Sequence, residues 1–387
     1  MKLIVDAKAL NDALDAPRRL APRVLLLVAI EGTLAVVADN TIVKVAVRCP
    51  ADIIESGQAC VPASLLFDLA QAMPPGPVTL GCTDGLVELH GGEEPDEDDH
   101  TDPVRCTLWA ITDEAAMPSI MAVEPPRVGQ VAMDKFAESM AQVLPAAPAR
   151  SPLPVVSVRS SRGALLCAAT DSYRLHLTRS RMVEAAAWSH EALIPIEAIR
   201  LAMAMFPDGE AELLMDRDVL VLRSDLAVLT TRLSTEKFPS YQKVLPRIED
   251  AAAKLSVNTE TLLAALARVA PIAGLTNGEH KVRLSAYPED KLVTVESAAP
   301  DAGQSKATVR AHLVEGAGFS FSTDIRHLTA AAKAATSERL MIFWTAPRKP
   351  ILIQGFGSDF SAMVMPIHKP TTPAIAAAEP PIHEVTA

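Results

Sequence analysis

The residue types that carry enzyme chemistry occur in this sequence, but not at the spacings that common mechanisms use. The nine histidines stand singly along the chain. No stretch matches the phosphate-binding loop G-x-x-x-x-G-K-[ST], the nucleophile turn G-x-S-x-G or the zinc helix H-E-x-x-H. We therefore nominate no catalytic residue, and we expect a protein that is not an enzyme and needs no cofactor.

The densest set of potential metal ligands is the acidic run Glu93-Glu94-Pro95-Asp96-Glu97-Asp98-Asp99-His100. Calcium loops space their oxygen ligands around a fixed glycine, and this run has no such spacing. We interpret it as a solvated hairpin loop and predict no metal site. The five cysteines are scattered without a C-x-x-C pair, so we expect reduced thiols in the cytoplasm and no zinc.

Composition and charge restrict the kind of partner. The 387 residues are 49% hydrophobic and 21% charged, which is typical of a folded protein with two or three domains. A net charge of −11 argues against binding nucleic acid over the whole surface, because cationic side chains supply most non-specific affinity. The longest apolar run, from Val24 to Ile30, is too short to cross a bilayer and suits a buried strand. Because the net charge is negative, any contact with DNA must be local.

A strand–cap–helix unit occurs three times along the chain. Each copy has a short apolar strand, an Asp or Asn placed to cap a helix, and a segment with apolar residues three and four apart. The capping residues Asp6, Asp134 and Asn258 recur at intervals of roughly 125 residues, which indicates a repeat. The predicted helices begin directly after them, the first over residues 7–15.

A second unit, a helix followed by a hairpin, recurs between these copies. It predicts helices over 62–73, from 194 to 206 and over 322–336, the last opened by Ser322. Any α+β chain produces such patterns by chance, but two interleaved patterns in register over three copies make that reading improbable. We expect three similar domains, 1–125, 126–248 and 249–368, and similar domains can close a ring. Residues 369–387 are rich in Pro and Ala and are predicted to be a disordered tail.

Three stretches resemble the beta subunit of bacterial DNA polymerase III, the sliding clamp family. They are Ala169–Leu175, which reads ATDSYRL; Glu236–Tyr241 with the following Val244–Pro246; and Val364–Ile367. The family has these motifs at a strand end, in the connector between its second and third domains, and in its last strand. They occur here in the family's order and at its separations, so the resemblance covers residues 1–368.

The resemblance implies an α+β DNA-clamp fold with three similar domains per chain, helices lining a central hole, β-sheets outside, and a ring-shaped homodimer. It implies a DNA polymerase processivity factor that encircles double-stranded DNA without reading its sequence. The implied partners are DNA polymerase, repair proteins and clamp loader subunits, with no membrane. The alternative is a clamp-like paralogue that binds peptides without stable DNA encirclement. Weakly charged helices motivate it, because helix 62–73 carries only Asp68 and helix 322–336 alone has excess basic residues.

In the family a hydrophobic pocket between domains two and three binds a short apolar peptide of each partner protein. Methionine suits such a pocket because its side chain packs adaptably. The motifs transfer this pocket to Leu153, Thr170, Ser172, Tyr173, Arg174, Leu175, Pro239, Lys243, Val244, Met363, Val364, Met365, Pro366 and Ile367. Taken singly, Leu175, Val244 and Val364 are better explained as strand core, and only the joint presence of the three motifs favours the pocket. Ser322, Ile325 and Pro350 depart from the family pattern, which predicts altered specificity at one wall.

The resemblance also implies DNA-facing residues and a dimer seam. The DNA-facing residues are Arg18, Arg19 and Arg23 in the loop after the first helix, and Arg150 in the equivalent loop of domain two. The seam residues are Arg105 and Leu108 on a late strand of domain one, and Ile272 and Leu275 after the first helix of domain three. Solvated surface arginines and ordinary core are the alternatives.

Overall fold

The computed structural model describes residues 1–92, 104–113, 117–118, 124–147, 153–161, 163–181, 183–185, 188, 190–276 and 278–367. Its contacts divide the chain into two compact units. The first runs from Met1 to Ser240 and includes Asp359–Ser361; the second runs from Tyr241 to Ser358 and continues from Ala362. The division into three domains is finer than these units, so it stays a prediction. The acidic run 93–100, Arg150 and the tail 369–387 lie outside the described residues.

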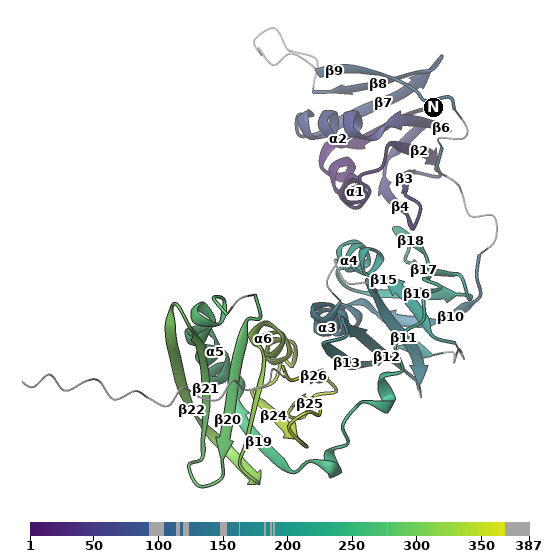
Figure 1. The fold of residues 1–387 in the computed structure, drawn as a ribbon. Helices are drawn as coiled ribbons and strands as arrows, with labels where there is room; N and C mark the ends of the chain where they lie inside the picture. The colour runs from purple at the N-terminus through teal and green to yellow at the C-terminus, as the bar shows by residue number, and fades with distance from the viewer. Residues whose placement is uncertain are drawn as a thin grey trace, which may run out of the picture. The chain divides into compact units, whose positions relative to one another are not determined.

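The first unit contains two copies of one strand–helix pattern (Figure 1). The first copy consists of β1 (Lys2–Asp6), α1 (Ala7–Arg19), β2 (Val24–Ile30), β3 (Thr33–Asp39), β4 (Val43–Pro50), β5 (Asp52–Glu55), β6 (Gly57–Pro62), α2 (Ala63–Ala72), β7 (Pro77–Thr83), β8 (Leu86–Gly91) and β9 (Val104–Trp109). The second consists of β10 (Arg127–Ala132), α3 (Met133–Val143), a 3-10 turn (Leu144–Ala146), β11 (Val155–Ser161), β12 (Ala164–Thr170), β13 (Arg174–Arg181), β14 (Glu184–Ala185), β15 (Ala192–Pro195), α4 (Ile196–Met205), β16 (Glu210–Met215), β17 (Val219–Arg223) and β18 (Ala227–Arg232).

The second unit repeats the pattern once more. It consists of two 3-10 turns (Tyr241–Lys243 and Ile248–Asp250), β19 (Ala253–Asn258), α5 (Thr259–Ala273), β20 (Lys281–Tyr287), β21 (Leu292–Ala299), β22 (Gly303–Gly316), β23 (Phe319–Asp324), α6 (Ile325–Ala334), β24 (Arg339–Trp344), β25 (Ile351–Gly355) and β26 (Ser361–Val364). Its strands run in the order β26-β25-β24-β19-β22-β21-β20-β23.

The strands of the first unit are hydrogen-bonded in three sets of neighbours. They are β5-β1-β7-β8-β9, β14-β10-β16-β17-β18-β4-β3-β2-β6 and β15-β11-β12-β13. The second of these sheets joins the two copies of the pattern, because β18 of the second copy pairs antiparallel to β4 of the first. One sheet therefore continues across the junction between the copies.

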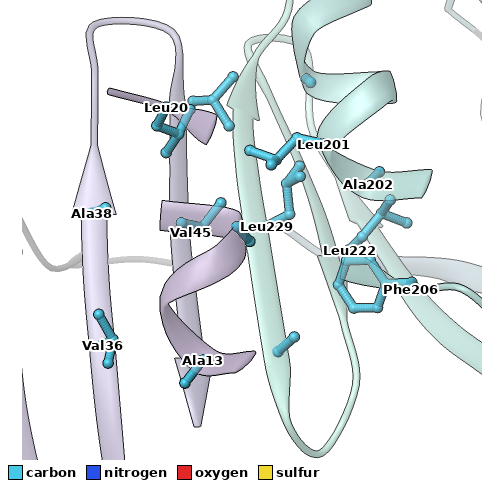
Figure 2. Packing of buried hydrophobic residues seen from close by; sticks show 14 of the residues in the cluster. Ala13, Leu20, Val36, Ala38, Val45, Leu201, Ala202, Phe206, Leu222 and Leu229 are labelled. Atoms are coloured by element: carbon cyan, nitrogen blue, oxygen red, sulfur yellow. The ribbon is translucent and has the colours of Figure 1, made fainter. Parts of the chain in front are cut away.

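Apolar packing follows the same path as the sheet. Leu10 and Leu14 of α1 are fully buried, and α1 packs on β3 and β4. Figure 2 shows Val45 of β4 near Leu229 of β18, and both side chains are buried. Burying each such side chain contributes about 1.5–3 kcal/mol, so the junction shares one core rather than two surfaces in loose contact.

Two of the three predicted helix caps are confirmed. Asp6 accepts hydrogen bonds from the backbone N–H of Lys8 (2.9 Å) and of Ala9 (3.1 Å). Asn258 accepts one from Thr261 at 3.0 Å. The prediction for Asp134 is wrong, because α3 begins at Met133, two residues earlier than predicted, and its N-cap, Ala132, has no side-chain bond. Asp134 instead lies in the first turn, where a carboxylate still complements the helix dipole.

Three other helix boundaries differ from the sequence-based prediction. Helix α1 continues past Pro17 to Arg19, so Arg18 and Arg19 lie in its last turn and not in a loop. Helix α6 begins at Ile325, because residue 322 still belongs to β23 and Asp324 provides the cap.

Helix α5 extends to Ala273, which puts Ile272 inside the helix and only Leu275 after it. In each case the helix boundary lies two to four residues away from the local sequence signal that predicted it.

The thiols are free and mostly buried. Burial raises the pKa of the Cys49 thiol to about 11 and that of Cys167 to about 12, so neither forms appreciable thiolate at neutral pH. Within the described ranges no group of three His, Cys, Asp or Glu side chains could hold a metal ion. No helix in that same part of the chain is long and apolar enough to span a membrane.

We predict that Asp6→Ala lowers the free energy of unfolding of the first unit by about 1 kcal/mol, because two N–H groups of α1 lose their acceptor. Asp134→Ala is the matched control and should cost about 0.5 kcal/mol or less, since only a dipole interaction is lost. Urea unfolding of the two variants measures both values. Equal losses would contradict the assignment of the caps.

Candidate functional site

The stretch that joins β12 to β13 is a turn organised by one carboxylate. The Asp171 carboxylate accepts hydrogen bonds from the backbone N–H of Tyr173 and of Arg174, both at 3.0 Å. It also forms an ion pair with the Arg174 guanidinium at 2.9 Å, and both side chains are only 12% exposed. Because the pair is shielded from water and aided by backbone donors, it fixes the turn more firmly than a surface ion pair would.

Thr170 and Ser172 complete the turn. The Thr170 hydroxyl donates to the carbonyl of Arg174 at 2.7 Å and accepts from the N–H of Ser172 at 3.1 Å. Ser172 has φ +76°, a left-handed conformation that costs a residue other than glycine about 1 kcal/mol or more. The surrounding bonds hold it there, and Tyr173 is 67% exposed as a result. The turn thus presents an aromatic ring to solvent on a rigid support.

The other predicted pocket residues of the first unit differ in exposure. Leu153 is half-buried and precedes β11, whose antiparallel pairing brings its start beside the Thr170 end of β12. Pro239 is exposed. Leu175 is 1% exposed and points into the core, so in this structure it supports the turn from within.

A buried contact below the turn was missed by sequence reasoning. His176 is fully buried, with Nδ1 2.8 Å from the carbonyl of Gln142 and its ring edge-on to Phe360 at 5.3 Å. Phe360 is 1% exposed and belongs to the first unit although it precedes the last strand. A single Phe in a Gly- and Ser-rich turn carries no local signal for such a long-range contact.

The predicted pocket residues of the second unit lie on the last strand and on the connector. Met363 and Val364 of β26 are buried, and Met365 is half-buried. The Thr323 hydroxyl donates to the carbonyl of Met365 at 3.2 Å, and the N–H of Ile367 donates to the carbonyl of Ser322 at 2.7 Å. The chain after β26, including the buried Pro366, is therefore held along the end of β23.

The connector residues are accessible. Lys243 ends the 3-10 turn and is exposed, and Val244 is 54% exposed. The interpretation as ordinary strand core therefore fits Leu175 and Val364, which are buried, but it does not fit the exposed Val244. Of the positions that depart from the family pattern, Ser322 acts through its backbone carbonyl and Ile325 is buried at the start of α6.

The predicted DNA-facing arginines are partly engaged with the protein. Arg18 lies over the Phe67 ring at 5.2 Å and donates to the Phe67 carbonyl at 3.4 Å. Arg19 pairs with Asp15 at 3.0 Å, with both side chains more than half exposed. Arg23 is exposed in the turn before β2. Exposed pairs of this kind are weak, so these guanidinium groups stay available to a phosphate.

The helices of the described chain are close to neutral. Over their observed bounds α1 carries +1 and α6 carries +2, α2 and α3 carry −1 each, and α4 and α5 carry none. The sum is +1. The whole chain carries −11, which leaves −12 outside the helices. The extension of α1 to Arg19 corrects the expectation that helix 322–336 alone has excess basic residues, because α1 also carries a net positive charge.

Among the strands with an unpaired side in the described part of the chain, β9 and β22 correspond to the two strands of the internal junction. Strand β9 pairs with β8 alone and ends its sheet. The first half of β22, residues 303–310, pairs with β21 on one side, whereas β19 pairs only with the second half. Of the predicted seam residues, Arg105 is exposed on β9 and Leu108 is 5% exposed within its sheet. Leu275 is 57% exposed, and Ile272 is half-buried.

Comparison with known proteins agrees with this architecture. Residues 242–368 match the family model described as the C-terminal domain of the DNA polymerase III beta subunit. The chain is 22% identical to the beta sliding clamp of Bacillus subtilis over 201 residues, which cover 51% of this chain and 52% of that relative. It is 22% identical to the beta sliding clamp of Synechocystis over 348 residues, 82% of this chain and 84% of the relative. The first of these alignments thus spans about half the length of its relative.

Solved structures show the fold over nearly the full chain. The DNA polymerase sliding clamp of Bacillus subtilis superposes with a TM-score of 0.86 at 18% identity, covering 95% of this chain and 99% of that chain. The DNA polymerase III subunit beta of Pseudomonas aeruginosa gives a TM-score of 0.84 at 18% identity, covering 95% and 100%. The predicted α+β clamp fold is confirmed. With the family model over residues 242–368 and the sequence relatives at 22% identity, it shows what this chain is similar to: the DNA polymerase III beta subunit, the sliding clamp.

Proposed function

We propose that this chain is a DNA sliding clamp, in which two copies form a ring that encircles double-stranded DNA and holds DNA polymerases on it. In this role the protein binds and tethers but catalyses no reaction, and it works in the cytoplasm beside the chromosome. The match of residues 242–368 to the family model and the similarity to beta sliding clamps support the proposal. The structural observation that carries it is the β18–β4 pairing together with the two open edges at β9 and β22.

The junction inside the chain suggests how two copies would join. Strand β18 is the last strand of its half-repeat, and it closes against β4, the third strand after α1. Strand β9 is the last strand of the corresponding half in the first repeat of the chain. The first half of β22 belongs to the third strand after α5. Within the described residues, each has one side without a neighbouring strand, and such edges readily pair with another strand.

The pairing registers predict which residues would meet. Counted along the ladders from β1 and β10, Cys106 of β9 is the counterpart of Leu229 of β18. Counted from β6 and β23, Ser305 of β22 is the counterpart of Val45 of β4. Leu229 pairs with Val45 inside the chain, so Cys106 of one copy is expected opposite Ser305 of the other.

The helix ends support the same seam. Ile272 is fourteen residues after the cap of α5, as Leu20 is after the cap of α1. Leu20 is buried and lines a hollow at the internal junction with Leu201 of α4 (Figure 2). Ile272 and the exposed Leu275 would occupy this place between copies. Two such junctions per dimer, related by a twofold axis, would close the ring.

DNA would be retained by enclosure more than by attraction. The near-neutral helices and the exposed Arg19 and Arg23 give few phosphate contacts, so direct affinity for linear duplex should be low and fall with salt. A ring needs no attraction to stay on DNA. The same weak charge is the one observation that favours the second candidate, a paralogue that binds peptides without encircling DNA.

Polymerases and clamp loader subunits are proposed to bind through apolar peptide segments. The exposed Tyr173 on its rigid turn and the exposed Val244 on the connector offer apolar area, and Met365 offers an adaptable side chain. Aromatic anchors on a fixed backbone lose little entropy when they bind, so Tyr173 should contribute strongly.

We predict that Tyr173→Ala and Met365→Ala each weaken binding of an apolar polymerase peptide by about 10- to 100-fold, which corresponds to about 1–3 kcal/mol of lost contact. Asp171→Ala should act similarly, because it releases the turn that holds Tyr173. Tyr287→Ala is the matched control, an aromatic residue 47% exposed on β20, and should leave affinity within about twofold. Fluorescence anisotropy with a labelled peptide measures all four, and a similar loss at Tyr287 would overturn the assignment.

We predict that Ser305→Cys forms a disulfide with the native Cys106 of a second copy under mild oxidation, because paired Cα atoms lie within disulfide range. Gln304→Cys is the control, since its side chain points to the opposite face of β22 and should not react. Non-reducing electrophoresis detects the product. Absence of the cross-link with Ser305→Cys would show that the register is wrong.

The same variant tests encirclement. After loading on nicked circular DNA and oxidation, the linked dimer should stay bound through high salt and be released when the DNA is cut. A dimer that cross-links but is never retained on circular DNA would favour the peptide-binding paralogue over the clamp.

A further inference from the structure

The sheet β23-β20-β21-β22 of the second unit has one face covered by helices and one polar face. Helix α5 packs on β20, β21 and β22, and α6 packs on β23 (Figure 1). Residues that point toward these helices, such as Val282, Val295 and Val309, are buried. Alternate residues along each strand point to the opposite face, where half-buried and exposed polar side chains predominate. This second face is therefore suited to water or to a polar ligand.

One end of the polar face is hollowed and cationic. The hollow is lined by Lys281, Arg283, Lys306 and Glu296, and otherwise only by serine, glutamine and alanine residues. Arg283 pairs across to Glu296, and Glu296 pairs across to Lys306, so these three residues form a row over adjacent strands. Three cations and one acid give the hollow a charge of +2, on a chain whose total charge is −11.

The protein itself does little to neutralise these cations. In the described part of the chain neither Lys281 nor Lys306 has an ion-pair partner, and the Glu296 carboxylate lies 3.5 Å from the Arg283 guanidinium. Both side chains of that pair are more than a third exposed, and exposed pairs are weak. The Gln304 amide, also in the lining, forms no hydrogen bond within the same residues. The hollow thus offers cations beside a neutral donor, a combination that binds phosphate oxygens.

The spacing of the cations favours a flexible chain of phosphates. Lys281 and Arg283 are two residues apart on one strand, about 7 Å, and Arg283 and Lys306 are two strands apart, about 10 Å. A single DNA strand can bend its backbone into the hollow and reach all three cations, whereas duplex DNA is a stiff rod that reaches fewer of them. An acidic protein segment would need apolar anchors for its affinity, and no large apolar side chain lines the hollow.

We propose that this hollow binds the phosphate backbone of single-stranded DNA, on the face of the sheet opposite to α5 and α6. In the proposed ring the helices line the hole, so this strand would be held outside the ring and would not be encircled. The hollow lies within one unit of a single chain, and its binding therefore does not depend on the proposed dimer. A small cationic site on an acidic protein is the local kind of DNA contact that the net charge permits.

The test measures binding of the full chain to a labelled thymidine oligonucleotide of about 12 nucleotides, which has free ends and so cannot be retained by encirclement. By fluorescence anisotropy we expect a dissociation constant of about 1–100 μM at about 50 mM salt. Lys281→Gln, Arg283→Gln and Lys306→Gln together should weaken binding at least about tenfold and reduce the slope of log affinity against log salt by about 2. A duplex of the same length should bind at least about fivefold more weakly than the single strand.

The control removes three exposed cations of the same unit that lie outside the hollow, by Lys291→Gln, Arg348→Gln and Lys349→Gln. It changes the net charge equally and should leave affinity within about twofold. Glu296→Gln is the opposite change, because it removes the acid of the hollow. It should tighten binding about two- to threefold, which damage to the fold would not do.

Lys306 lies on the edge strand of the proposed seam, so sedimentation must show that each variant keeps the oligomeric state of the wild type. Lys281→Gln with Arg283→Gln, two strands from that edge, should by itself give at least half of the loss on a logarithmic scale.

Three results would overturn this inference. Equal losses in the hollow and control variants would show a response to total charge alone. Equal affinity for duplex and single strand would contradict the assignment to single-stranded DNA. A glutamate-rich peptide that binds through the same three cations, while the oligonucleotide does not bind, would assign the hollow to an acidic protein segment. None of these results bears on the proposed clamp, which is tested separately by retention on circular DNA.

Discussion

The structure depends on antiparallel pairing between the edge strands of successive repeats. Strand β18 pairs with β4 over five residues, and the sheet and core of one copy continue into the next. Each repeat carries one edge strand equivalent to β18 and one equivalent to β4. A strand edge left open exposes backbone donors and acceptors to any competing strand. A short linear array of such repeats always leaves one edge of each kind, here β9 and the first half of β22. A second copy is the simplest partner that satisfies both.

The residues proposed to bind partners lie outside these paired sheets and add little to the stability of the fold. The turn at Asp171 uses a shielded ion pair, backbone bonds and a left-handed Ser172 to hold Tyr173 outward, where its side chain is 67% exposed. Because the turn is already rigid before a ligand binds, its conformational entropy is lost on folding and not on binding. Under the proposed function the helices would follow a similar logic, because their near-neutral charge would weaken attraction to DNA and so permit movement along it.

Much of the fold could be predicted from the sequence because the repeat constrains it three times over. Asp6 and Asn258 were identified as caps, but Asp134 was not distinguishable from a cap, since an acid one residue inside a helix fits the same local pattern. Ending the first helix at residue 15 underestimated it, because Pro17 lies near its end, where a lost backbone bond costs little. The turn at the site was found through its motif. The contact of His176 with Phe360 was not, because nothing local encodes a partner so distant in sequence.

The internal junction and the proposed junction between copies differ in how apolar they are, and the difference fits the proposed ring, which would have to open to admit DNA. Inside the chain the facing pair is Val45 and Leu229, both buried and purely apolar. At the open edges the corresponding residues are Cys106 and Ser305, which bury less apolar area, so strand pairing between copies should be weaker than pairing within one. An apolar seam strong enough to hold alone would resist opening, because its stabilisation responds little to ions. A proposed seam with weak apolar pairing would separate more readily when a loading protein engages it.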